Sequence, residues 1–175
     1  MSALFSEFTL TTPRGPLTLA NRGVVAPMCQ YSCDNGLASD WHLIHWGSLL
    51  NSGASLLILE ATAVTARGRI TPHCLGLWDD ATAAALADKL QRARHQAPPV
   101  PVAIQLAHAG RKASSEVPWR GGMLINDQPP GWWPEAPSAL PHLDNESAPE
   151  AMSAQALAEE RDAFVQAARR AQDMG

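Results

Sequence analysis

Short apolar runs alternate with longer amphipathic segments along most of this chain. Three runs, at residues 24–26, 56–59 and 100–106, are continuous and rich in aliphatic side chains, as in strands that are buried on both faces. After each run, directly or beyond a loop, apolar residues recur at intervals of three and four, which predicts an amphipathic helix. This order of strands and helices indicates right-handed βαβ crossovers and a parallel sheet, so the expected fold class is α/β.

Each predicted helix begins at a residue that can cap it and ends at a stop signal. The candidate N-caps are Ser39 or Asp40, Asp79 or Asp80, and Ser153. The stop signals are, in chain order, Asn51 to Gly53, Pro98-Pro99, and Gly175 at a C′ position. The residues expected on the inward faces are Leu43, Trp46 and Leu50; Ala83, Leu86, Ala87 and Leu90; and Leu157, Phe164, Ala168 and Ala171.

Two further segments depart from this alternation. Residues 8–10 and 17–19 alternate apolar and polar side chains around a turn, which predicts a β-hairpin outside the main sheet. Residues 107–152 show no periodicity and are rich in Gly, Pro, Trp and Ser; a connection of this length is usually a functional loop. The tryptophans expected to pack this loop, rather than to touch a ligand, are Trp119, Trp132 and Trp133. No shift of composition divides residues 1–175 into two domains.

Composition and charge exclude several classes of partner. The net charge is −4 and the pI is about 5.8, and no Lys/Arg cluster stands out, so we expect no nucleic acid and no anionic membrane surface. No apolar run is long enough to span a bilayer and no leader is evident, which makes the cytoplasm the expected location. Three cysteines without C-x-x-C spacing indicate free thiols rather than disulfides or a zinc ribbon.

The first candidates for chemistry follow the first apolar run. Pro27 cannot donate to a sheet, so the strand stops there and Cys29 and Tyr31 are displayed at its carboxyl end. Ligands of parallel α/β proteins bind at that end. Taken alone, Cys29 is typical of an inert core thiol and Tyr31 of a packing aromatic, while Gln105, near the end of the third run, could equally satisfy a neighbouring backbone group.

Histidines offer a second kind of candidate. His42 and His45 form an H-x-x-H pair on a predicted helix and could share one face, but without a third ligand we favour ordinary helix histidines over a metal site. His108 and Arg111 follow the third strand, where anchoring of the loop is at least as good an interpretation as ligand contact.

Several motifs together resemble one family. They are, in chain order, Asn21-Arg22, Ala26-Pro27-Met28-Cys29-Gln30-Tyr31-Ser32, Asp40-Trp41-His42-Leu43-Ile44-His45, Glu60-Ala61-Thr62-Ala63-Val64, Gly68-Arg69-Ile70-Thr71-Pro72 and Gln105-Leu106-Ala107-His108-Ala109-Gly110-Arg111-Lys112-Ala113. The chain is similar, from about Phe5 to Gly175, to the old yellow enzyme family of FMN-dependent NAD(P)H oxidoreductases. Within it, the motifs resemble the bacterial branch with a cysteine beside the flavin, which includes xenobiotic reductases and ene-reductases.

The resemblance implies a fold, a reaction and a set of site residues. Family members are single TIM (β/α)8 barrels that pass a hydride from NADPH or NADH to FMN, and then to the β-carbon of an α,β-unsaturated carbonyl or xenobiotic, in a ping-pong cycle. The cofactor-binding residues carried over by motif are Ala26, Pro27, Met28, Cys29, Ala61 and Gln105. The catalytic residues are Tyr31, which faces the substrate, and Cys29, whose thiol is associated with tuning the flavin potential.

The chemistry of three of these residues agrees with the implied roles. The carboxamide of Gln105 can donate hydrogen bonds to the acceptors, and accept them from the donors, on the pyrimidine edge of a flavin. A thiol at Cys29 can stabilise the extra electron density of a reduced ring, and Tyr31 can donate a hydrogen bond to a substrate carbonyl.

Family members are about twice as long as this chain, so it is expected to hold the N-terminal half of the barrel: the hairpin and about three βα units. One hypothesis is an ene-reductase, apparently truncated, that keeps part of the FMN surface. The alternative is a non-catalytic half-barrel that self-associates and binds flavin weakly or not at all; exposed parallel edges predict a homo-oligomer in either case. A metal-dependent TIM-barrel hydrolase using the chain's histidines is a less favoured third class.

Overall fold

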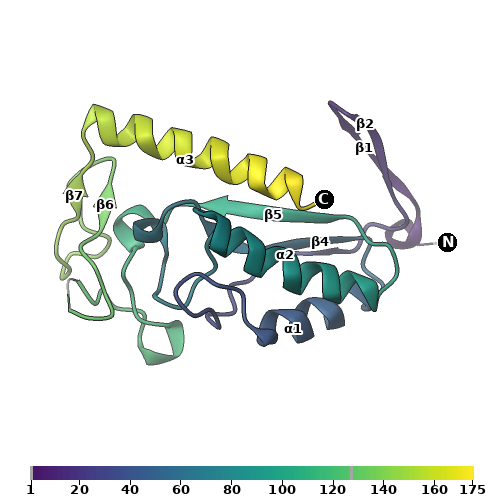
Figure 1. Cartoon of the computed structure of the whole chain (residues 1–175), viewed down its shortest axis with the longest axis horizontal. Coiled ribbons are helices and arrows are strands. Elements are labelled where there is room, and N and C mark those ends of the chain that lie inside the picture. Colours follow the sequence, from purple (N-terminus) through teal and green to yellow (C-terminus); the bar gives the residue numbers. More distant parts are fainter. Residues whose placement is uncertain (1, 127) are drawn as a thin grey trace.

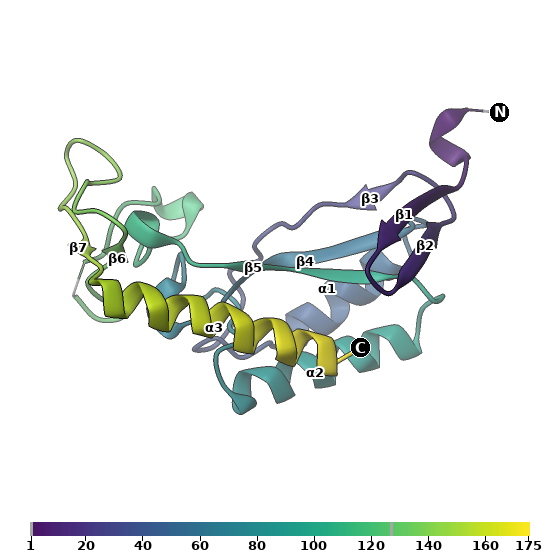
Figure 2. The same ribbon diagram turned by 90° about the horizontal axis from the view of Figure 1, so that it is seen from above.

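The computed structural model describes residues 2–126 and 128–175, and its centre is a parallel sheet with strand order β3, β4, β5. The strands are β3 (Val24–Val25), β4 (Leu56–Ala63) and β5 (Val102–Ala107), and the helices are α1 (Asp40–Leu50), α2 (Asp80–His95) and α3 (Ala154–Asp173). Strands that are adjacent in the sheet are also consecutive in sequence, as in a TIM barrel. Figure 1 shows the order of the elements, and Figure 2 shows the three helices on one side of the sheet; no described helix covers the other side.

The helices begin where their capping residues predict. Ser39 is the N-cap of α1, and the Asp79 carboxylate accepts a hydrogen bond from the amide of Thr82 at the start of α2. The Ser153 hydroxyl likewise accepts from the amide of Ala156 in α3. At the other end of α3, Gly175 adopts a φ of +87°, the left-handed conformation expected of a C′ glycine.

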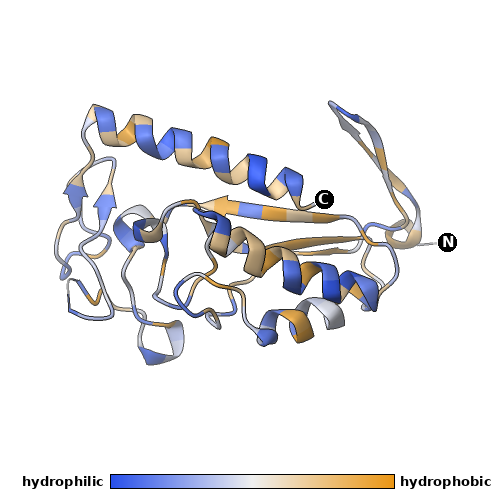
Figure 3. Ribbon diagram, in the orientation of Figure 1, coloured by the Kyte–Doolittle hydropathy of each residue, from blue (hydrophilic) through white to orange (hydrophobic). Residues whose placement is uncertain are grey.

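The main core lies between the sheet and the first two helices. Trp46 and Leu50 of α1 and Leu86 of α2 are buried against Leu57 and Leu59 of β4. A second cluster, around Val64, Leu77 and Ala167, holds α3 to the carboxyl ends of β4 and β5. Figure 3 shows hydrophobic residues along β4 and β5, whereas the helices alternate hydrophobic and hydrophilic positions. No helix among the described residues is long and apolar enough to cross a membrane.

Three predictions about the strands and helices need correction. The first strand was expected to be buried on both faces, but β3 is two residues long and Val24 is 46% exposed, because among the described strands β3 pairs only with β4. β5 begins at Val102 rather than at residue 100. On α3, Ala167 is the buried alanine while Ala168 and Leu157 are exposed, because the helix turns a slightly different face to the sheet.

The hairpin and the long loop are present as expected. Strands β1 (Phe8–Thr12) and β2 (Gly15–Leu19) pair with each other and with no other described strand. The long loop contains two 3-10 turns and a small parallel pair, β6 (Glu135–Ala136) and β7 (Glu150–Ala151). Trp132 packs this loop as predicted, since its indole N–H donates to the carbonyl of Arg67 at 2.8 Å.

Candidate functional site

The carboxyl ends of the three strands bring most of the predicted site residues together. Ala61 of β4 and Gln105 of β5 are direct partners in the parallel register, so their side chains share one face of the sheet. This is the face that no described helix covers, because Ile104, which precedes Gln105 on β5, points to the opposite face and packs into the helix-covered core. Gln105 is accordingly exposed.

The segment that follows β3 is irregular and is held by hydrogen bonds at Gln30. Its amide donates to a Glu60 carboxylate oxygen at 2.9 Å. Its side-chain amide donates to the carbonyl of Met28 at 2.8 Å and its side-chain oxygen accepts from the indole N–H of Trp41 at 3.1 Å. These bonds fix the backbone of the residues around Gln30, while the Met28 side chain stays 54% exposed toward solvent.

Cys29 forms a thiol pair with Cys74, which lies in the loop between β4 and α2. The Cys74 sulfur also accepts from the amide of Thr71 at 3.4 Å. The hydrogen bond from Cys29 is the largest cause that lowers the pKa of Cys74 to about 7, and the same bond, together with burial, raises the pKa of Cys29. Cys29 also contacts the backbone of Ala61, so its thiol lies beside one of the two paired strand residues.

Tyr31 has an unusual backbone conformation and an aromatic neighbour from the long loop. Its φ is +51°, in the left-handed region that non-glycine residues rarely adopt. Its ring meets that of Trp119 edge to face, with centroids 5.5 Å apart and planes at 81°. Burial raises the pKa of the Tyr31 phenol, and the charges of Cys29, Cys74 and Glu60 add to the effect. The phenol is thus held in its protonated, donating form at neutral pH.

The histidines have structural contacts. His42 is fully buried and its Nδ1 accepts from the amide of Ser39 at 3.0 Å, while His45 stacks on Trp41. His108 Nδ1 accepts from the amide of Gly110, which anchors the start of the long loop. Among residues 2–126 and 128–175, no three His, Cys, Asp or Glu side chains are grouped so as to hold a metal ion.

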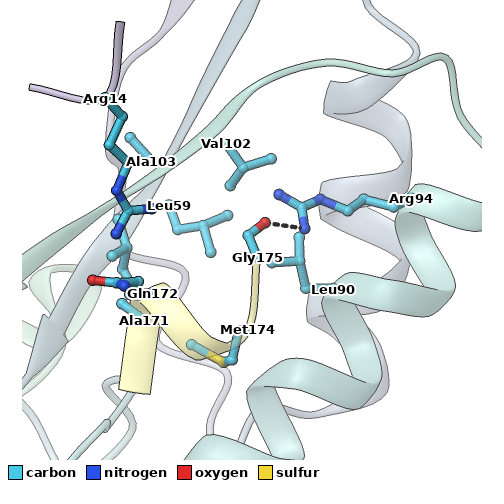
Figure 4. Close-up of a pocket in the computed structure, with 11 residues that line it drawn as sticks. Arg14, Leu59, Leu90, Arg94, Val102, Ala103, Ala171, Gln172, Met174 and Gly175 are labelled. Atoms are coloured by element: carbon cyan, nitrogen blue, oxygen red, sulfur yellow. Dashed lines mark hydrogen bonds between the residues drawn. The ribbon is translucent and has the colours of Figure 1, made fainter. Parts of the chain in front are cut away.

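A cavity of about 320 Å³ lies away from these residues. Figure 4 shows it between the end of α3 and the first residues of β5, with Val102, Met174 and Gly175 in its wall and the guanidinium of Arg94 bonded to the Gly175 carbonyl. The ligand end of a parallel sheet is the opposite, carboxyl end. We therefore place the candidate site at Ala61 and Gln105, not in this cavity.

Sequence reasoning missed three residues that shape this region. Glu60 was noted only as part of a motif, yet its side chain is buried and bonded to Gln30. Cys74 and Trp119 come from loops without periodicity, so no pattern in the sequence linked them to Cys29 and Tyr31. The sequence held one signal for Glu60: it is a charged residue in a largely apolar strand, and a buried carboxylate needs hydrogen-bond or charged partners.

Comparison with known proteins gives a consistent picture. The family model described as the NADH:flavin oxidoreductase / NADH oxidase family matches residues 4–175. An NADH:flavin oxidoreductase of Gibberella zeae is 40% identical over 168 residues, which is 94% of this chain and 40% of the relative. An NADPH dehydrogenase of Geobacillus thermodenitrificans is 40% identical over 176 residues, 99% of this chain and 46% of the relative.

Solved structures agree on the fold. A morphinone reductase matches with a TM-score of 0.76 and 26% identity, covering 99% of this chain and 46% of that protein. The old yellow enzyme homologue of Zymomonas mobilis matches with a TM-score of 0.72 and 23% identity, again over 99% of this chain and 46% of that protein. The chain thus spans less than half the length of these relatives, and its fold is part of their TIM barrel, with three βα units among the described residues. This chain belongs to the NADH:flavin oxidoreductase / NADH oxidase family, the family of the old yellow enzymes.

Proposed function

We propose that this chain supplies part of the FMN site of an NAD(P)H-dependent oxidoreductase that reduces activated carbon–carbon double bonds. The observation that carries the proposal is the pairing of Ala61 with Gln105 on the uncovered face at the carboxyl ends of the strands. Bound FMN would supply hydride transfer between NADPH or NADH and the β-carbon of the substrate.

The residues at this face fit a flat, polar-edged ring system. Ala61 carries only a methyl group, so a ring can approach the backbone of β4 closely. Gln105 is exposed beside it and offers both a donor and an acceptor, as the pyrimidine edge of a flavin requires. Ala26, Pro27 and Met28 would complete this wall from the segment after β3.

Cys29 and Tyr31 would act from the same segment. The neighbouring Cys74 and burial raise the pKa of Cys29, so it would present an S–H group that polarises the flavin without covalent chemistry. Tyr31 is protonated and would donate a hydrogen bond to the carbonyl oxygen of an α,β-unsaturated carbonyl or related xenobiotic. That bond stabilises the negative charge that develops on the oxygen as the β-carbon receives the hydride.

Visible spectroscopy tests the proposal on the chain itself. The purified, desalted protein is measured before and after addition of FMN, and NADPH is then added anaerobically. Flavin that co-elutes with the protein and bleaches with NADPH supports a working cofactor site. Protein that never retains FMN at micromolar concentrations would refute the proposal for this chain.

The uncovered sheet face favours a second property, self-association. Val24 and Met28 are 46% and 54% exposed, and β3 and β5 each pair on one side only among the described strands. Such edges and apolar surfaces are association sites. Sedimentation velocity should show a dimer or larger species, and a monodisperse monomer that melts cooperatively would contradict this expectation.

A further inference from the structure

Glu60 is the extra residue of a β-bulge in β4. Leu59 pairs with Ile104 and Ala61 pairs with the next residue, Gln105, so Glu60 has no partner in the register. The inserted residue has a direct consequence for the candidate site. Leu59 and Ile104 both lie on the helix-covered face, and without the bulge Glu60 rather than Ala61 would stand beside Gln105 on the uncovered face.

The bulge turns the Glu60 carboxylate into the protein, where it connects three elements. One oxygen accepts from the amide of Gln30, in the segment after β3, at 2.9 Å. The other lies 3.5 Å from Nε2 of His42 on α1, and both side chains are at most 1% exposed. Because His42 Nδ1 accepts from the amide of Ser39, the ring proton belongs on Nε2, which contacts the Cys33 sulfur at 3.6 Å and lies beside the Glu60 carboxylate.

Burying the Glu60 carboxylate at this position costs free energy, because the charge loses its hydration. A leucine would occupy a similar volume without the cost of desolvating a charge, and the oxygen that faces His42 accepts no hydrogen bond within normal geometry. Unlike an apolar side chain, the carboxylate provides a hydrogen-bond acceptor for the backbone amide of Gln30. The amide it binds lies between Cys29 on one side and Tyr31 on the other.

The charge of Glu60 also acts on the groups around it. It contributes to the raised pKa values of Tyr31, Cys29 and Cys33, although burial is the largest cause for Tyr31 and Cys33 and the bond to Cys74 is the largest for Cys29. The titratable groups that face Glu60 are His42 and His45 on α1; Cys29, Tyr31 and Cys33 after β3; and Cys74 after β4.

We propose that Glu60 is a positioning residue that fixes Cys29 and Tyr31 by binding the amide between them, with His42 behind it. The role in flavin chemistry rests on the proposed function; the positioning itself does not. The left-handed backbone at Tyr31 is a conformation that needs such support from its surroundings.

The test uses the full chain and two variants, Glu60→Leu and Glu60→Gln. Glu60→Leu removes both the acceptor and the charge, whereas Glu60→Gln keeps an acceptor oxygen for the Gln30 amide. The matched control is Glu146→Gln, because the Glu146 side chain is 3% exposed and likewise accepts from a backbone amide, that of Leu124, beside a histidine. Circular dichroism checks that each variant folds.

Two readouts follow the variants without using flavin. Hydrogen exchange of the Gln30 amide should be at least about tenfold faster in Glu60→Leu and close to wild type in Glu60→Gln. Because Tyr31 is the only tyrosine, the pH-dependent change in near-UV absorption reports the ionisation of its phenol alone, and its pKa should fall in both Glu60 variants. Glu146→Gln should change neither readout.

Unchanged Gln30 exchange in a folded Glu60→Leu would overturn the proposal. If Glu60→Leu does not fold, Glu60→Gln decides: slow Gln30 exchange with a lowered Tyr31 pKa supports the proposal, and an unchanged Tyr31 pKa overturns it. Adding FMN separates the two proposals. A wild-type chain that binds no FMN refutes the proposed function and leaves these readouts valid.

Discussion

Trp119 and Tyr31 come from segments more than eighty residues apart, and their rings meet edge to face at 5.5 Å. Trp119 is 69% exposed, so the indole contacts the Tyr31 ring without being buried itself. Burial is the largest cause of the raised Tyr31 pKa. We expect the ring of Trp119, in the long loop, to contribute to this burial of a residue that we propose to face the substrate.

Trp119→Ala should therefore lower the pKa of Tyr31 toward the usual value of about 10. Near-UV absorption reports the tyrosinate directly, since the chain has one tyrosine. Trp119→Phe, which keeps an aromatic edge, should give an intermediate value. Trp133→Ala is the control, because Trp133 is in the same loop, whereas the ring that contacts Tyr31 within the described part of the chain is that of Trp119. Equal pKa values in wild type and Trp119→Ala would contradict the prediction.

The thiol pair predicts the reactivity of Cys29. Its pKa is raised chiefly by the hydrogen bond to Cys74, so Cys74→Ala should lower that pKa and increase the thiolate fraction. Alkylation of Cys29 by iodoacetamide at pH 8, followed by peptide mass spectrometry, should become several-fold faster. Cys33→Ala serves as the control, since the Cys33 sulfur contacts His42 instead. A rate that is the same with and without Cys74 would show that the pair does not hold the Cys29 proton.

Glu160 predicts a pH dependence of stability. Burial raises the pKa of its carboxyl, and the nearby His108, 3.8 Å away, has its own pKa lowered by burial and so offers no compensating charge at neutral pH. The raised pKa means that the contribution of Glu160 to stability is fully present below its unfolded pKa and is lost as the pH rises through its folded pKa.

Glu160→Gln should consequently increase the free energy of unfolding at pH 7 and change it little at pH 4. Urea denaturation at the two pH values measures this. Glu159→Gln, one residue away on the exposed side of α3, should have no such effect. A loss of stability at pH 7 in Glu160→Gln would mean that the charged carboxylate is favourably paired in the folded state.

The reciprocal cap of α2 makes a simpler prediction. The Asp79 carboxylate accepts from the Thr82 amide at 2.8 Å, and the Thr82 hydroxyl accepts from the Asp79 amide at 3.2 Å. Asp79→Ala should cost about 1 kcal/mol of the free energy of unfolding, and Asp79→Asn should recover most of it. Asp144→Ala, in an exposed part of the long loop, is the control. Equal urea midpoints for Asp79→Ala and wild type would contradict this role for the cap.

Local chemistry explains which parts of the fold could be predicted. The start of each helix could be predicted from its N-cap residue, because capping depends only on residues that are close in sequence. These N-caps are Ser39, Asp79 and Ser153. The exposure of Val24 could not be predicted in this way, because it depends on which strands lie beside β3.

In the candidate site, too, some features could be predicted from the sequence and others depend on tertiary structure. Ala61 and Gln105 were proposed from motifs, and their pairing agrees with a common ligand surface. The bulge at Glu60, the bond between Cys29 and Cys74 and the contact of Trp119 with Tyr31 all depend on tertiary structure. The residues in these contacts are far apart in the sequence, so the spacing of residues along the chain does not predict them.

FMN binding to alanine-to-leucine variants tests the central claim most directly. Ala61 and Ala103 lie on the same face of the sheet, but Ala103 pairs with Ile58, farther from the carboxyl ends. Titrations that follow FMN fluorescence should show saturable binding to wild type and to Ala103→Leu, and binding at least about tenfold weaker to Ala61→Leu, whose larger side chain would meet the ring. Equal affinities of all three proteins, or no saturable binding to wild type, would contradict a flavin site at Ala61 and Gln105.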